Sequence, residues 1–172
     1  INLLKMSYTK KEDHNYKIQH ITYNTIINRI IHISDIHIHL YKRHDEYNYV
    51  FQKLLTSLQN EKKRVTKSSK NTNIPIIAVI TGDILHSKSD LSPECIQMTY
   101  QLFKDTSNIM PCVIIPGNHD LNMNNKNRLD SLTPIISDLP KYNPIYYLNE
   151  TGIWKMGNLV FGHASIFDYH II

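Results

Sequence analysis

Side chains that can bind metal ions occur in three short clusters along the 172-residue chain. The first holds Asp35 and His37, the second holds Asp83 and His86, and the third is the run Gly117-Asn118-His119-Asp120. Carboxylate and imidazole ligands together suit Mn²⁺, Fe²⁺ or Zn²⁺ better than Ca²⁺. A single carboxylate such as Asp83 can also bridge two ions that lie roughly 3.5–4 Å apart. The residue types therefore predict a site for divalent metal ions.

Each cluster directly follows an apolar run that is rich in β-branched residues. The three runs are 29–34, 76–81 and 112–116. Continuous runs of this kind predict strands that are buried on both faces, in a sheet that helices cover. Ligands in such folds bind beyond the carboxyl ends of the strands. We therefore expect the three clusters to meet at one edge of one sheet.

The remaining periodicity predicts alternating helices and strands. Apolar residues at helical spacing predict a helix over 45–60, and Ser92-Pro93-Glu94 has the composition of a helix N-terminus. The expected elements after the third cluster are a short helical region at 128–139, strands at 144–148 and 159–163, and a turn or short strand at 152–157. This order predicts an α/β domain with a largely parallel sheet.

The ends of the chain have less pattern. Residues 1–28 are expected to form a weakly ordered N-terminal extension with a short β segment near 18–27, so the folded domain is expected over 29–172. The chain starts at Ile1, and its last residues are apolar, so both ends look cut, or the start lies at Met6.

Composition limits the class of protein without identifying a substrate. A net charge of +4 permits a polyanionic partner but does not require one. The basic stretch 61–73 is expected to be a solvated loop, with contact to a phosphate backbone as the alternative. Two cysteines give no disulfide framework, and no apolar run is long enough to cross a membrane. These features predict an intracellular, soluble protein.

The three clusters resemble the motifs DxH, GDxx and GNHD of the calcineurin-like metallophosphoesterase superfamily. This resemblance implies a two-layered β-sandwich flanked by helices, two divalent metal ions and an activated water that attacks phosphorus. By position, Asp35 and His37 resemble ligands of the first ion, Asp83 the bridging ligand and Asn118 a ligand of the second ion. His119 resembles the catalytic histidine, and the neighbouring Asp120 is expected to orient its imidazole.

A narrower resemblance points to one branch of the superfamily. The run Gly82-Asp83-Ile84-Leu85-His86 looks like the GDLFH motif of SbcD-type DNA-repair nucleases, and Arg43 with Glu46 and the run 116–120 also match that branch. It implies a DNA exonuclease or endonuclease in repair or recombination, with His86 assisting catalysis near the phosphate. It further implies Mn²⁺ as the ion, a homodimer and a coiled-coil ATPase partner of the SbcC type.

The sequence also departs from the family pattern. The family completes its site with a late histidine and a GHxH motif, whereas the candidates here are His163, expected to be a strand-end residue, and His170. The domain is therefore expected to be incomplete at its C-terminus. His39 replaces a small residue and is expected at the surface or supporting the ligands. Two alternatives stay open: a phosphatase or nucleotide phosphodiesterase of the same superfamily, and a truncated, inactive fragment that binds a partner.

Overall fold

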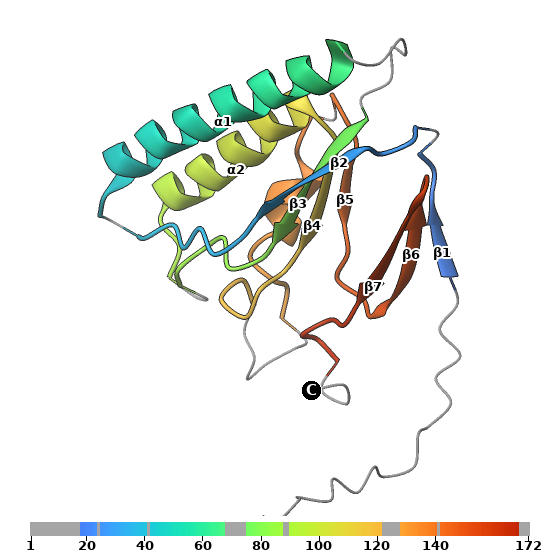
Figure 1. The fold of residues 1–172 in the computed structure, drawn as a ribbon. Helices are drawn as coiled ribbons and strands as arrows, with labels where there is room; N and C mark the ends of the chain where they lie inside the picture. The colour runs from blue at the N-terminus through green and yellow to red at the C-terminus, as the bar shows by residue number, and fades with distance from the viewer. Residues whose placement is uncertain are drawn as a thin grey trace, which may run out of the picture.

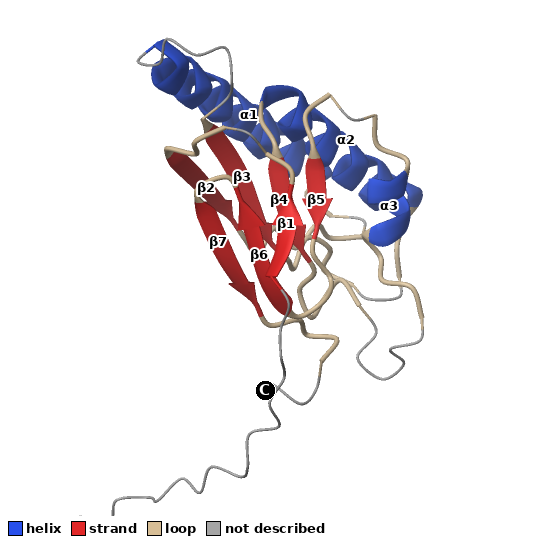
Figure 2. Ribbon diagram, turned by 90° about the vertical axis from the view of Figure 1, so that its right-hand side faces the viewer, coloured by secondary structure: helices blue, strands red, loops and turns tan. Residues whose placement is uncertain are grey.

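Two β-sheets pack face to face, and helices cover the outer face of the larger sheet (Figure 1, Figure 2). The computed structural model describes residues 18–23, 25–40, 42–67, 75–87, 90–121, 128–140 and 142–168. The expected class, an α/β β-sandwich flanked by helices, is confirmed.

The larger sheet consists of four parallel strands in the order β2-β3-β4-β5. These strands are β2 (Arg29–Ile33), β3 (Ile76–Thr81), β4 (Cys112–Ile115) and β5 (Ile145–Tyr147). Ile33 pairs with Ile80, which in turn pairs with Ile114. The first three strands therefore end nearly level, as the positions of the three clusters require.

The smaller sheet has the order β1-β6-β7 and combines both kinds of pairing. Its strands are β1 (Ile18–Ile21), β6 (Gly152–Met156) and β7 (Leu159–His163). β1 runs parallel to β6, and β6 runs antiparallel to β7. Gly157, in the turn between β6 and β7, has a φ of 58°, a backbone conformation that glycine adopts without strain.

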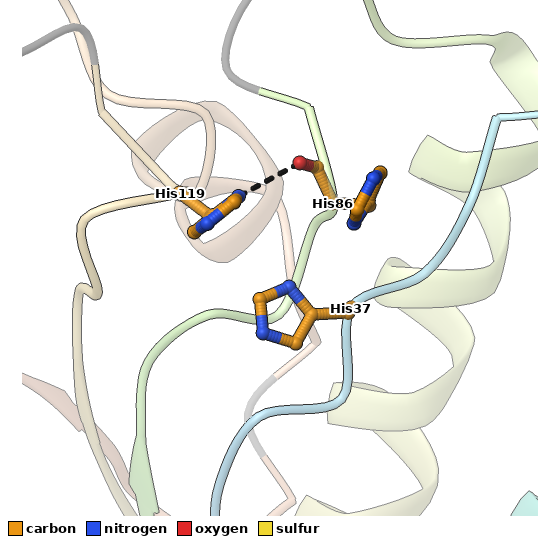
Figure 3. A group of neighbouring side chains, drawn as sticks. All are labelled: His37, His86 and His119. Carbon is orange, nitrogen blue, oxygen red and sulfur yellow. Dashed lines mark hydrogen bonds between the residues drawn. The ribbon is translucent and has the colours of Figure 1, made fainter.

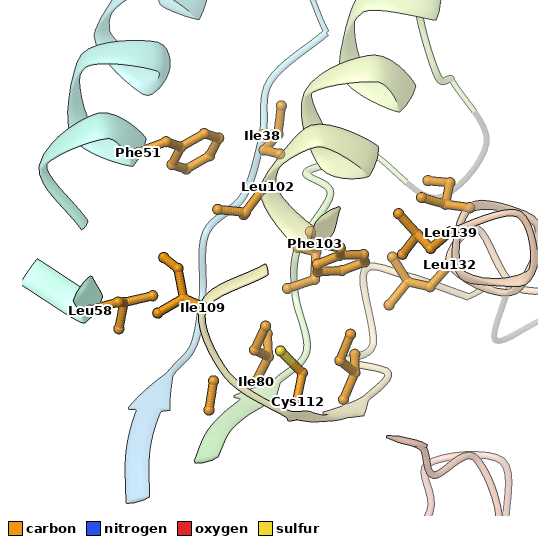
Figure 4. Close-up of a cluster of buried hydrophobic side chains, with 14 of the residues drawn as sticks. Ile38, Phe51, Leu58, Ile80, Leu102, Phe103, Ile109, Cys112, Leu132 and Leu139 are labelled. Atoms are coloured by element: carbon orange, nitrogen blue, oxygen red, sulfur yellow. The ribbon is translucent and has the colours of Figure 1, made fainter. Parts of the chain in front are cut away.

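The helices pack on the larger sheet over the main hydrophobic core. They are α1 (His44–Lys67), α2 (Pro93–Ile109) and α3 (Thr133–Ser137). Phe103, Leu58 and Ile80 are almost completely buried in this core (Figure 4). A second core, between the two sheets, contains Ile77 and Val113. The central strands β3 and β4 are thus buried on both faces, which explains their continuous apolar runs. The run 29–34 was expected to be buried in the same way, but β2 is an edge strand and its alternate residues, such as Ile30, are exposed.

Helix α1 extends further than its apolar spacing predicts. Residues 61–67, expected to belong to a solvated loop, form its last two turns. Glu61 pairs with both Arg29 and Arg64, and Val65 packs against the main core. The expectation of a loop is therefore wrong for 61–67, because these residues have high helix propensity and find partners; residues 68–73 lie outside the described part of the chain.

The expected start of the folded domain, at residue 29, also needs correction. Residues 18–21, expected in a weakly ordered extension, form β1, which confirms part of the short β segment expected near 18–27. Ile27 is 4% exposed, and its N–H donates to Oδ1 of Asn158 (2.7 Å) in the β6–β7 turn. The folded unit therefore includes residues well before 29, while 1–17 lie outside the described part.

Ser92 caps α2 as predicted, since its Oγ accepts a hydrogen bond from the N–H of Cys95 (3.3 Å).

Among the helices that the structure describes, none has the length and apolar character needed to cross a membrane.

Candidate metal centre

The loops after β2 and β3 run side by side and bring the first two clusters together. The N–H of His37 donates to the carbonyl of Asp83 (2.9 Å), and Ile38 forms an isolated parallel bridge with Leu85. The pairing of the two strands thus continues, in looser form, past their carboxyl ends. The side chains of the first cluster consequently lie beside those of the second.

Two glycines allow the loops after β3 and β4 to approach each other at backbone distance. A Cβ on Gly82 would collide with the backbone of Gly117, and a Cβ on Gly117 would collide with the backbone and carboxylate of Asp83. The N–H of His119 donates to Oδ1 of Asp83 (2.9 Å). The third cluster therefore meets the second at Asp83. Asn118, which is exposed, is the residue between Gly117 and His119 and so belongs to the same loop.

Asp120 joins these two loops, a role that the sequence did not suggest. Its carboxylate is fully buried and accepts hydrogen bonds from the N–H groups of Ile84 (3.0 Å), Leu85 (3.1 Å) and Gly117 (2.9 Å). Burial raises the pKa of Asp120 to about 6, although these hydrogen bonds oppose the shift. The expectation that Asp120 orients His119 is wrong: the carboxylate accepts from backbone N–H groups, and the ring of His119 makes its hydrogen bond to the carbonyl of His86 instead.

The Nδ1 atom of His119 instead lies 2.8 Å from the carbonyl oxygen of His86. A carbonyl can only accept, so Nδ1 carries the proton and Nε2 has the free lone pair.

Three of the predicted ligands have a strained backbone. Asp35, His37 and Asp83 have φ values of 55°, 49° and 51°, in the left-handed region. Such a conformation costs a non-glycine residue of order 1–2 kcal/mol. Among the described residues, one further non-glycine, Arg43, has a positive φ. Strain concentrated on ligand-type residues is typical of a functional site.

Asp35, His37 and Asp83 present their donor atoms to a common point. Nε2 of His37 lies 3.8 Å from Oδ1 of Asp35 and 3.9 Å from Oδ2 of Asp83. Two ligands of one ion, each at about 2.0–2.2 Å from it, are at most about 4.4 Å apart. Both separations are too long for hydrogen bonds and fit a shared divalent ion, so the donor set suits a metal.

Two further imidazoles, those of His86 and His119, lie on the other side of His37. The ring centroid of His37 lies 4.7 Å from that of His119 and 5.8 Å from that of His86, and Figure 3 shows the three rings facing a common space. His39 stacks on His86 with centroids 3.8 Å apart. Burial and the neighbouring His86 lower the pKa of His39. His39 therefore lies next to the site, in agreement with the expectation that it supports the residues there.

The hydroxyl of Tyr47, on α1, donates to the carbonyl of His37 (2.5 Å) and helps to fix its loop. The sequence gives no sign of this contact, because Tyr47 fits the apolar stripe of the helix. His163 lies at the end of β7, and its Nδ1 is 2.9 Å from the carbonyl oxygen of Glu150. It belongs to neither group of potential ligands found among the described residues. His170 lies outside them.

The sequence profile of the calcineurin-like phosphoesterase family matches residues 28–171. The chain is also 43% identical, over 148 residues, to a protein of Acanthamoeba polyphaga mimivirus titled "Uncharacterized protein R555". That alignment covers 86% of this chain and 10% of the viral protein, so the chain spans about a tenth of its relative. The profile match covers all four strands of the larger sheet, β6 and β7 of the smaller sheet, and all three clusters. The chain therefore belongs to the calcineurin-like phosphoesterase family.

Proposed function

We propose that this protein hydrolyses phosphodiester bonds in DNA with the aid of two divalent ions, of which Mn²⁺ is the expected one. Membership of the family indicates the coarser activity, metal-dependent phosphoester hydrolysis. In our proposal Asp35 and His37 bind the first ion, Asp83 binds both ions and Asn118 binds the second. Ions held there would neutralise charge on a phosphoryl group and lower the pKa of a bound water.

The observation that carries the choice of a phosphodiester is the position of His86 beside His119. Their rings are nearly parallel, with centroids 5.9 Å apart, and both adjoin His37. A phosphodiester that loses an alkoxide needs a proton donor at the leaving oxygen, and imidazole is suited to supply one near neutral pH. Two imidazoles therefore lie beside the carboxylates of Asp35 and Asp83, which supports a role for them at the leaving oxygen.

The hydrogen bond from Nδ1–H of His119 to the carbonyl of His86 fixes the direction in which His119 can act. With Nδ1 occupied, Nε2 is the atom that takes up a proton, which gives the imidazolium, and then releases it to the leaving oxygen. We propose that His119 performs this transfer and that His86 stabilises charge on the phosphate.

The basic segment gives no support for DNA binding at this site. Residues 61–67 form the end of α1 opposite to His44. A helix of 24 residues is about 36 Å long, so this segment is far from the loops that follow the strands. The proposal of a DNA substrate therefore depends on His86, whose motif resembles that of the SbcD-type nucleases. By the same resemblance we propose a homodimer and an SbcC-type ATPase partner.

The test compares linear duplex DNA with p-nitrophenyl phosphate as substrates in the presence of Mn²⁺. We expect DNA cleavage that a chelator abolishes and that His119→Ala lowers by about 10²–10⁴-fold, the usual contribution of a proton donor. His20→Ala, at an exposed position on β1, is the matched control and should retain full activity. Undiminished cleavage by His119→Ala would reject the role of His119. Hydrolysis of p-nitrophenyl phosphate alone would favour the alternative, a phosphatase.

A further inference from the structure

We infer that His37, His86 and His119 form a separate site for Zn²⁺, and that an ion bound there competes with the carboxylate-side ion for His37. One potential ligand atom from each of these three residues lies within 4.8 Å of the other two. Asp35 and Asp83 form a different group with His37. His37 is thus common to two sets of ligands with different chemistry.

The two ring nitrogens of His37 face these two sets. Nε2 lies 3.8–3.9 Å from the carboxylate oxygens of Asp35 and Asp83. Nδ1 is buried and has no hydrogen-bond partner in the structure. Nδ1 is the nitrogen next to the ring atom that is bonded to Cβ. In Figure 3 it points toward the space between His119 and His86. A buried nitrogen without a partner is costly, and an ion on this side would satisfy it.

His119 has the arrangement of a metal-binding histidine. Ligating histidines almost always donate their other ring N–H to a carbonyl, a carboxylate or a water, which fixes the tautomer. The carbonyl of His86 accepts from Nδ1 of His119 at 2.8 Å, so Nε2 is left for an ion. His86 is itself held by its stack on His39. Two of the three ligands are therefore oriented by contacts within the chain.

Three neutral imidazoles are a ligand set that favours Zn²⁺. Zinc accepts three histidines and a water in a tetrahedral site, whereas Mn²⁺ prefers oxygen ligands. In such a site the nitrogens lie about 3.4 Å apart, and one nitrogen of each ring already lies within 4.8 Å of the other two, so the rings would have to move closer together to bind an ion.

Sharing of His37 makes the two sites antagonistic. A neutral imidazole binds an ion through one nitrogen because the other carries the proton. An ion on Nδ1 therefore places the proton on Nε2 and removes that atom from the carboxylate side. The inference about Zn²⁺ binding stands independently of the proposed hydrolysis, while any inhibition of hydrolysis rests on it.

The test measures ion binding and not activity. Zn²⁺ is titrated against a chromophoric chelator into the wild type and into the double variant Asp35→Asn with Asp83→Asn, which weakens the carboxylate side. We expect the double variant to keep its Zn²⁺ affinity within about threefold. Loss of a contact that only supports a ligand typically lowers metal affinity by roughly 10–100-fold. If His86 is itself a ligand, adding His86→Gln to the double variant should lower its Zn²⁺ affinity by more than this. His20→Gln, on β1, is the control and should leave the affinity unchanged.

A second arm follows Mn²⁺ binding by electron paramagnetic resonance. One equivalent of Zn²⁺ should weaken Mn²⁺ binding at least tenfold in the wild type and should have no such effect in His86→Gln. Circular dichroism checks the fold of each variant, and His119→Gln replaces His86→Gln if the latter does not fold. Equal Zn²⁺ affinity with and without these histidines, or its loss in the double carboxylate variant, would overturn the inference. Neither result depends on whether the protein cleaves DNA.

Discussion

Replacement of Gly117 by Ala tests the close contact between the loops that carry the second and third clusters. The added Cβ would overlap the backbone nitrogen and carboxylate of Asp83, and backbone atoms cannot move aside as a flexible side chain can. Overpacking costs about 1–3 kcal/mol, and the lower entropy of the unfolded alanine chain offsets about 0.4–1 kcal/mol. Since the collision involves backbone, we expect a net loss of about 2 kcal/mol.

The assay is thermal or urea unfolding followed by circular dichroism. For a chain of this size a loss of 2 kcal/mol lowers Tm by about 4–8 °C. Displacement of Asp83 should also weaken Mn²⁺ binding by about 10–100-fold, since the contacts that orient a ligand typically have effects of this size.

Gly162→Ala provides the matched control, because a Cβ at this position of β7 meets nothing within 4 Å. We expect it to be neutral or to stabilise the protein by about 0.4–1 kcal/mol. If Gly117→Ala and Gly162→Ala unfold at the same temperature and bind Mn²⁺ equally, the close approach of the two loops does not constrain the site.

Two further predictions concern the surroundings of the site. Tyr47→Phe removes the hydrogen bond to the carbonyl of His37 and should cost about 1 kcal/mol in urea unfolding; Tyr49→Phe, at an exposed position of α1, should cost nothing measurable, and equal effects of the two would argue against the contact. Burial lowers the pKa of His163 below its ordinary value of 6.5, so the unfolded chain binds this proton more readily. This contribution to stability is complete above that value and is lost as the pH falls below it. His163→Gln should therefore lose less stability than the wild type between about pH 7.5 and about pH 5.5, and parallel pH profiles would contradict the assignment.

The central strands of the larger sheet, β3 and β4, were predictable from sequence because each is buried on both faces and leaves a continuous apolar run. The N-terminus of α2 was equally predictable, since Ser92 and Pro93 act through local backbone geometry. The meeting of Asp35, His37 and Asp83 followed from parallel strands that end level. These features depend on short-range patterns or on a general rule of sheet topology.

Other features depend on contacts that no local pattern encodes. The partner of β1 is β6, more than 130 residues along the chain, and neither strand carries a signal of that pairing. Asp120 looked like a partner of its neighbour His119, but turn geometry directs its carboxylate to N–H groups of the loop after β3. The stack of His39 on His86 likewise requires the two loops to be adjacent.

The anchoring of Ile27 against the β6–β7 turn has a practical consequence for the design of shorter versions of this domain. The family profile begins at residue 28, and a fragment cut there would keep every proposed ligand and catalytic side chain. It would lose β1 and Ile27, and so uncover Trp154 and Met156 on one wall of the inter-sheet core. The span that carries the chemistry is thus shorter than the span that must fold cooperatively, and expression boundaries are better placed upstream of Ile18.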